Sequence, residues 1–317
     1  MFKTPFKLTI LVIMKLQIFK FSLLLLSLFF ITPLFSQDKS EIKRQNKNSN
    51  SSYLSLSLSF ISDAVYLGRK DSITAPYLNP SIIYYHQSGF YGIGSFSYLT
   101  KADQSRIDLF FGSIGYDFTS KDLSGDFSIT KYFFNTDSYN VISEVDADIT
   151  ASIKYDFDLL YLSASSTYFI PKNGNSDIFL STEIGHDFVS STKDFQISPS
   201  IGVHFGSQNF YEEYYINNRF GSKRTGSGSG SGSGSGQGTG TTPTETTTVI
   251  MTESEKFDLM AIEFSLPIWY INKPFIVSFL PVLVLPQNPA TLTVDSVVYK
   301  EDLETTFYWM AGISYRF

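Results

Sequence analysis

The feature of this sequence that most constrains its fold is a period of two in hydrophobicity, sustained over unusually long stretches. Residues 54–60 read Leu-Ser-Leu-Ser-Leu-Ser-Phe, so the large apolar side chains share one face of a strand and the serines share the other. The longest example covers residues 141–155. A strand of a soluble sheet has about 6 residues, whereas a strand tilted across a bilayer needs about 9 to 11. The pattern therefore predicts strands that cross a membrane.

Twelve such stretches follow one another, and the connections between them alternate in length. Tight connections are expected near 88–89, 119–122, 156–158, 190–193 and 269–273. The other set contains every long loop, near 66–77, 101–104, 135–139, 171–175, 207–256 and 286–305. Short periplasmic turns and longer outside loops are typical of bacterial outer-membrane barrels. The stretches are about 53–65, 78–87, 89–100, 105–118, 123–134, 140–156, 158–170, 176–189, 194–206, 257–268, 274–285 and 306–317.

We therefore predict an all-β fold, a transmembrane antiparallel up-and-down β-barrel of about 12 strands over residues 53–317. The connection 207–256 is expected to be a long extracellular loop. It contains a Gly/Ser/Thr-rich tract at residues 226–248, which is too polar and flexible to pack. This tract either displays hydroxyls and shields the surface or is a tolerated insertion in an exposed loop.

The first 36 residues have the pattern of a signal peptide. Lys15 and Lys20 form a positive n-region, residues 22–35 form an apolar h-region, and cleavage is expected after Ser36. An uncleaved anchor is the alternative, but the apolar run is short for a spanning helix of about 20 residues. Either Met1 or Met14 can be the start of translation. Residues 37–52 are polar and are expected to form a flexible periplasmic lead-in.

The last strand carries the pattern of an assembly signal. Trp309, Ile313, Tyr315 and Phe317 fall on one face of this strand, which must pair with the first strand to leave no open edge in lipid. An ordinary edge strand that ends in Phe is the alternative. Together, the LFSQ segment near the cleavage point, the alternating strands and the terminal SYRF resemble Bacteroidetes-like outer-membrane β-barrel proteins of unassigned function. The resemblance implies a Gram-negative outer membrane and carries over no catalytic residue.

Composition excludes several classes of function. The chain has no cysteine, which excludes disulfides and thiolate metal sites. The net charge of -6 argues against a nucleic-acid partner, because neutralising phosphates needs a basic surface. His186 and His204 lie on different strands without carboxylates at a readable spacing, so neither a metal nor another cofactor is expected. The expected partners are membrane lipid, the barrel-assembly machinery and small polar solutes.

One short motif raises the question of catalysis. His86 and Ser88 are two apart on a strand and so point to one face, as a base and a nucleophile require. His86-Gln87-Ser88 looks like the His-Gln-Ser element of outer-membrane phospholipases. However, residues 89–99 contain no Asn, Asp or Glu to orient the histidine, and the segment falls at an expected periplasmic turn. A turn without catalysis is therefore the favoured interpretation, and a lipid hydrolase is a remote alternative.

The expected inner face is rich in charge. Buried charges must be paired or hydrated, so this face indicates either a hydrated pore lined by acids, which would favour cations, or a salt-bridged interior that closes the barrel. The first function hypothesis is therefore a small pore or channel for polar solutes. The alternative is a non-conducting structural or surface-binding barrel. The candidate lumen-lining residues are Asp108, Glu144, Asp146, Asp148, Glu183, Glu263, Arg106 and Lys154.

Overall fold

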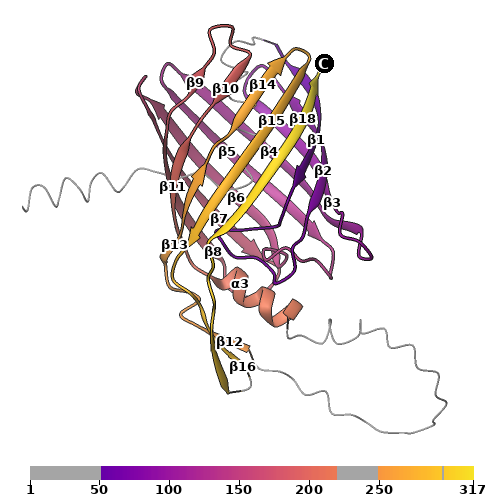
Figure 1. The fold of residues 1–317 in the computed structure, drawn as a ribbon, viewed down its shortest axis with the longest axis vertical. Helices are drawn as coiled ribbons and strands as arrows, with labels where there is room; N and C mark the ends of the chain where they lie inside the picture. Colours follow the sequence, from indigo (N-terminus) through magenta and orange to yellow (C-terminus); the bar gives the residue numbers. More distant parts are fainter. Residues whose placement is uncertain (1–50, 220–248, 295) are drawn as a thin grey trace, which may run out of the picture.

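The long alternating stretches form the wall of a closed antiparallel barrel of 12 strands (Figure 1). The computed structural model describes residues 51–219, 249–294 and 296–317. Every neighbouring pair in the ring is antiparallel, and the ring closes where β1 pairs with β18. In order around the ring the strands are β1 (Tyr53–Ile61), β2 (Tyr77–Tyr85), β3 (Phe90–Leu99), β4 (Arg106–Ser120), β5 (Leu123–Phe134), β6 (Val145–Asp156), β7 (Tyr161–Pro171), β8 (Asp177–Gly185), β11 (Ser200–Gly206), β13 (Asp258–Ser265), β15 (Phe275–Pro286) and β18 (Thr306–Arg316).

Three short strands extend this wall at one end. They are β9 (Phe188–Val189), β10 (Phe195–Ile197) and β14 (Ile268–Asn272). Pro199 separates β10 from β11, and Pro267 separates β13 from β14, because proline has no N–H for the ladder. The ladder resumes beyond each proline, where β10 pairs with β14. The sequence prediction ended this wall strand at residue 268 and was wrong there, since β14 continues to Asn272.

The two ends of the barrel differ in their connections, and we call them the turn end and the loop end. At the turn end, Gly89 adopts a φ of 97°, and a Cβ on this residue would lie 2.2 Å from the Asp117 carbonyl oxygen. The backbone N–H of Phe317 donates to Leu54 O at 2.9 Å, so both ends of the barrel wall meet at the turn end. The long connections all leave from the loop end.

The two faces of the wall have opposite chemistry. Outward side chains form an exposed apolar band, which includes Leu56, Ile82, Ile114, Phe127 and Ile153. A surface so apolar is suited to lipid rather than water. The inner face carries small hydroxyls, of which the following are buried: Ser55, Ser81, Ser95, Ser113, Ser128, Thr130, Thr150, Ser163, Ser165, Thr167, Ser181 and Ser200. Among the described residues, no helix is long and apolar enough to cross a membrane.

A cap closes the loop end. It consists of α3 (Asn209–Tyr214), the π-helix η1 (Tyr215–Arg219) and a separate sheet of β12 (Val249–Thr252), β16 (Thr291–Val294) and β17 (Val297–Lys300). Figure 1 shows α3 below the barrel, with β12 and β16 farther out. Loop residues Val141, Ile142, Phe210 and Tyr214 are almost fully buried and share one hydrophobic cluster with wall residues such as Val282. The structure therefore has a packed apolar plug at this end.

Candidate functional site

Arg69 fastens the plug to the wall. Its side chain is fully buried, and its guanidinium joins the loop between β1 and β2 to β13 and to the loop after β15. Burial lowers the pKa of Arg69, while the charge of Glu301, 4.0 Å away, opposes this shift. The guanidinium donates to Leu67 O at 3.2 Å, Met260 O at 2.9 Å, Gln208 Oε1 at 3.2 Å, Gln287 O at 3.0 Å and Asn288 O at 3.0 Å.

Tyr66 is the aromatic centre of the plug. Its ring packs against Phe169, Phe179 and Phe210 with centroid distances of 5.5, 5.5 and 5.2 Å. Burial raises the pKa of Tyr66 well above its ordinary value, and the charges of nearby carboxylates add to the rise. The phenol therefore stays neutral. Its ring packs as an apolar group in the centre of the plug and carries one hydroxyl.

The carboxylates near the loop end hold the loops in place. Asp177 accepts from Ser207 Oγ at 2.6 Å and from the backbone N–H groups of Asn209 and Phe210 at 2.9 and 2.8 Å. Asp108 accepts from Arg106 Nε at 2.8 Å and Ser138 Oγ at 3.1 Å. Both side chains are therefore anchors for the connections rather than open charges in a lumen.

Three of the candidate lumen-lining residues, Glu144, Asp146 and Asp148, do not share the inner face of one strand. Glu144 lies in a turn before β6, and the register with β7 shifts between Val145 and Ala147. This bulge turns Val145 into the plug and lets Asp146 pair with Lys131, which shares the outer face of β5 with the exposed Phe133. Asp148 remains inside, where it accepts from Tyr132 Oη at 2.5 Å. A bulge inserts one residue and so reverses the alternation on one side of it.

The turn end keeps inward acids that are bonded to tyrosines. Tyr91 Oη donates to Asp126 Oδ2 at 2.8 Å, Tyr161 Oη donates to Glu183 Oε1 at 2.7 Å, and Tyr85 donates to Asp117. A neutral phenol fixes a carboxylate without cancelling its charge. Sequence analysis did not name these tyrosines, Asp117 or Asp126. Alternation along β2 and β4 places Tyr85 and Asp117 on the inner face and could have identified them.

Two cations share this end with the acids. Lys154 Nζ lies 3.3 Å from Asp187 Oδ2 and 3.4 Å from the centroid of the Tyr161 ring. The Arg316 guanidinium lies 3.5 Å from the centroid of the Tyr53 ring. Both contacts are within the range of cation–π attraction. Lys154 is thus paired with Asp187 at this end.

A second interior group combines His204 and Glu263. His204 is 2% exposed, and its Nε2 lies 3.5 Å from Glu263 Oε2, which makes an ion pair only if the imidazole is protonated. Gly202 stands between them on the wall, and a Cβ there would lie 3.0 Å from His204 Nε2. The absence of a side chain at Gly202 thus lets the imidazole lean toward the carboxylate.

His86 and Ser88 do contact each other, with Nδ1 and Oγ 2.6 Å apart. Both residues lie at the turn end, where Gly89 N donates to His86 O at 2.9 Å. Within the described residues, no carboxylate is hydrogen-bonded to His86, so the pair lacks the third group that orients a catalytic histidine. Its geometry is that of a tight turn.

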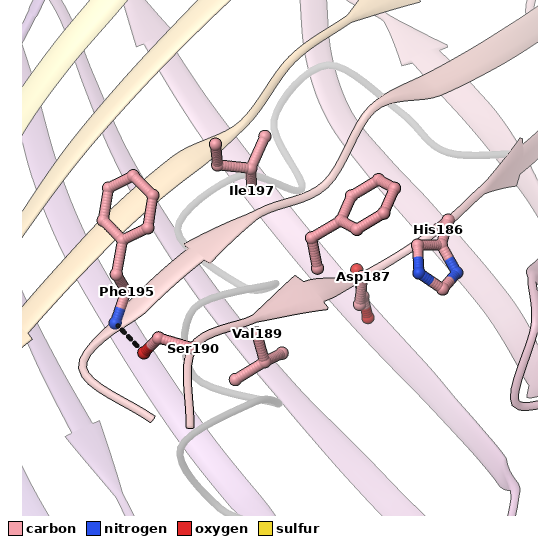
Figure 2. Close-up of a pocket in the computed structure, with 7 residues that line it drawn as sticks. His186, Asp187, Val189, Ser190, Phe195 and Ile197 are labelled. Atoms are coloured by element: carbon pink, nitrogen blue, oxygen red, sulfur yellow. Dashed lines mark hydrogen bonds between the residues drawn. The ribbon is translucent and has the colours of Figure 1, made fainter. Parts of the chain in front are cut away.

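An open hollow of about 430 Å³ lies on the wall extension at the turn end. Figure 2 shows Phe195 and Ile197 on one side of the β9–β10 ribbon and Val189 on the other, with Phe195 N donating to Ser190 Oγ at 3.1 Å. His186 contacts Leu159 O at 2.5 Å at this rim. Hydrogen bonds from Thr192 and Ser190 lower the pKa of Asp194 in the neighbouring turn. These contacts order the β9–β10 hairpin, and the hollow is mostly apolar.

The structure also bears on metal binding. In residues 51–219, 249–294 and 296–317, no three His, Asp or Glu side chains are grouped so that they could hold a metal ion.

Comparison with known proteins found similar solved structures only. No family model and no curated protein matches the chain. Among solved structures, the KdgM porin is similar over 83% of this chain and 99% of its own, with 8% identity and a TM-score of 0.43. The NanC porin matches over 83% and 98%, with 9% identity and a TM-score of 0.41. LpxR from Salmonella typhimurium matches over 82% and 99%, with 9% identity and a TM-score of 0.43. The structurally similar proteins are outer-membrane barrel proteins.

Proposed function

We propose that this protein is an outer-membrane channel for small polar solutes whose loop end is closed by the plug in the conformation described. The observation that carries the proposal is the hydroxyl-lined inner face of a 12-strand ring. Side chains fill the interior of a barrel of about 8 strands, and larger rings leave room for solute. Serine and threonine make this interior polar, although in the conformation described their side chains are buried.

The proposal includes location. The outward apolar band suits a bilayer, and the signal-peptide pattern of residues 1–36 lies outside the described residues. We propose export by this segment and insertion by the barrel-assembly machinery, with Trp309, Ile313, Tyr315 and Phe317 as the recognised strand. Their common outer face is observed, since Trp309 contacts Phe279 and Tyr315 contacts Phe317. Their role in assembly stays a prediction.

The plug favours a second candidate, a non-conducting barrel whose loop end binds a partner. A plug that Arg69 fastens to the wall suits a structural barrel. A channel with the same plug conducts only if the plug can move aside. The two candidates therefore differ in whether the lumen conducts once the plug is removed. A lipid hydrolase built on His86 and Ser88 remains the remote alternative and requires an orienting group for His86.

Conductance of two proteins in planar bilayers separates these candidates. One is the wild type. The other replaces residues 208–256 with Gly-Ser-Gly, which is feasible because Gly206 and Asp258 are register partners at the loop end, and carries Tyr66→Ala so that the plug also loses its aromatic centre. A gated channel gives low conductance in the wild type and a several-fold higher, stepwise conductance in the shortened protein. Heat-dependent gel migration checks that both proteins are folded. A folded shortened protein that never conducts would leave the structural barrel as the function.

A further inference from the structure

The strand β9 is the open edge of the wall extension at the turn end. It stands last in the order of the sheet, and among the described residues it pairs with β10 alone. The β7 ladder that runs beside β8 ends where Tyr161 pairs with Gly185. Beyond that pair the chain continues as β9 without a strand on this side, and the β6–β7 turn adjoins it through the contact of His186 Nδ1 with Leu159 O. The ladder position next to β9 is therefore open.

The backbone of Val189 faces this open position. The neighbouring pair of the hairpin is hydrogen-bonded, because Ser190 N donates to Phe195 O at 2.9 Å. Hydrogen-bonded and non-hydrogen-bonded pairs alternate along an antiparallel ladder, so Val189 and Gln196, the next pair, are not bonded to each other. The N–H and C=O of Val189 therefore point away from β10, and no hydrogen bond from another segment of the described chain reaches them. They offer one donor and one acceptor to a further strand.

An apolar hollow accompanies the open edge. Its volume of about 430 Å³ lies in the range of about 300–1,000 Å³ that pockets for small ligands occupy. Phe188 and Val189 of β9 line it together with Phe195 and Ile197 of β10 (Figure 2). Phe188 and Val189 are 58% and 51% exposed, and Leu159 in the adjoining β6–β7 turn is 77% exposed. The edge thus combines a main-chain pairing position with space for apolar side chains.

The open backbone groups select a polypeptide as the occupant. An open sheet edge is unfavourable in hydrocarbon, because lipid tails cannot bond N–H and C=O groups. An added strand supplies both main-chain partners and side chains for a pocket, which is how extended peptides bind to sheet edges.

The charges beside the edge select the ends of such a peptide. Asp156 and Asp158 lie in the β6–β7 turn and Asp194 lies in the β9–β10 turn, where Lys193 is the only basic residue of residues 156–160 and 190–194. Hydrogen bonds from neighbouring hydroxyls hold the pKa of Asp194 below its ordinary value, so this carboxylate stays charged. The surroundings of the edge are therefore negative and favour basic side chains on the peptide.

We propose that the β9 edge is a docking site for an extended segment of another protein, with apolar side chains at alternate positions and basic side chains at its ends. The segment pairs with Val189 through its main chain and places an apolar side chain in the hollow. The predicted topology puts the turn end in the periplasm, which makes the partner a periplasmic protein. The inference goes beyond the proposed channel function, because docking at this edge does not require a conducting lumen.

Fluorescence anisotropy with the protein in lipid nanodiscs tests the docking site. The probes are three labelled peptides, Lys-Φ-Thr-Φ-Thr-Φ-Lys, in which Φ is Phe, Leu or Val throughout. At least one of them is expected to bind. Its amide nitrogens are then methylated either at the Φ residues or at the Thr residues, and one of these two forms should bind at least tenfold more weakly, because one set faces β9. Replacing both Lys by Glu should weaken binding several-fold.

Variants of the protein locate the binding. Val189→Pro removes the outward N–H and should weaken binding at least tenfold, since proline is tolerated at a sheet edge but cannot donate. Val189→Thr keeps the N–H and the branched shape, and its affinity should stay within threefold of the wild type. Ile197→Trp fills the hollow and should weaken binding tenfold. Leu123→Ser, at the exposed start of β5, is the control and should leave the affinity within twofold.

Heat-dependent gel migration checks that every variant is folded. Failure of all three peptides to bind the wild type would overturn the inference, and so would equal binding to empty nanodiscs, which would show that the lipid takes up the peptides. Unchanged affinity in both Val189→Pro and Ile197→Trp would overturn it as well. A wild-type dimer in native mass spectrometry that Val189→Pro dissociates would identify a second copy of this chain as the occupant, against the docking of a different protein.

Discussion

Carboxylates accept from wall tyrosines at both ends of this barrel, Asp108 and Asp148 toward the loop end and Asp126 and Glu183 at the turn end, but at the loop end Asp108 and Asp177 also accept from loop and cap groups. At the loop end, Asp177 accepts backbone N–H groups of the cap, and Asp108 accepts Arg106 and a loop hydroxyl. At the turn end, Asp126 and Glu183 accept tyrosine hydroxyls that arise from the wall itself. The carboxylates at the loop end thus anchor loops in addition to meeting the wall, whereas those at the turn end are held by the wall tyrosines.

This difference indicates which end of the barrel sets its ion selectivity and which end closes its lumen. A carboxylate saturated by donors from a loop mainly stabilises that loop, and removing it costs stability. A carboxylate held by a neutral phenol still contributes its full charge to a narrow lumen, where water screens poorly. We therefore expect closure to depend on the loop end and ion preference to depend on the turn end.

The largest expected effect is a difference in thiol labelling between the two ends, which shows which end lies outside the cell. The chain has no cysteine, so a single introduced thiol is a clean probe. Lys300→Cys, on the exposed β17 strand at the loop end, should react with a membrane-impermeant maleimide on intact cells. Ser191→Cys, in the exposed β9–β10 turn, should react only after the outer membrane is disrupted. The reverse labelling would show that the barrel is inserted the other way round. The expected outside position of residues 226–248, which lie outside the described residues, depends on the same orientation.

A smaller effect, on the protease resistance of the plug, is expected when Arg69 is substituted. Arg69→Met removes the donor to Leu67 O and Gln287 O and the cation opposite Glu301, and loss of one partner in a buried polar network costs roughly 3 kcal/mol. Limited proteolysis should then cut residues 62–76 or 287–305 far faster than in the wild type, while the wall remains folded by heat-dependent gel migration. Lys70→Met is the matched control, since its 3.6 Å pairing with Asp63 is half-exposed and should be worth under about 1 kcal/mol. Equal protease resistance of both variants would contradict the role assigned to Arg69.

The smallest effect is expected from Asp146. Because its partner Lys131 is on the outer face, Asp146→Asn should leave the reversal potential of a conducting barrel unchanged. Asp126→Asn lies inside the turn end and should shift the preference toward anions. Both measurements are made in a salt gradient across a planar bilayer, with the shortened protein if the wild type is closed. Equal shifts of the reversal potential in the two variants would contradict the difference proposed between the two ends.

The sequence by itself determined the wall. Alternation fixes which side chains face lipid, because the side-chain period of a strand is two, and the antiparallel barrel of about 12 strands is confirmed. The same alternation assigns Lys154, Glu183 and Glu263 to the inner face, and their role there stays a prediction. Each of these conclusions needs only local parity and turn chemistry.

Only the tertiary structure decided what the inner residues do. The bulge before Ala147 changes the side of Asp146, and no local signal at residues 141–147 marks it. The plug joins Tyr66 to Phe210, and the ring places Gly202 between Glu183 and Glu263 on its neighbouring strands. Such groupings depend on which strands become neighbours when the ring closes and on how loops fold over its mouth. The alternation of a single strand encodes its two faces, whereas the partners of each inner side chain are set by the whole ring.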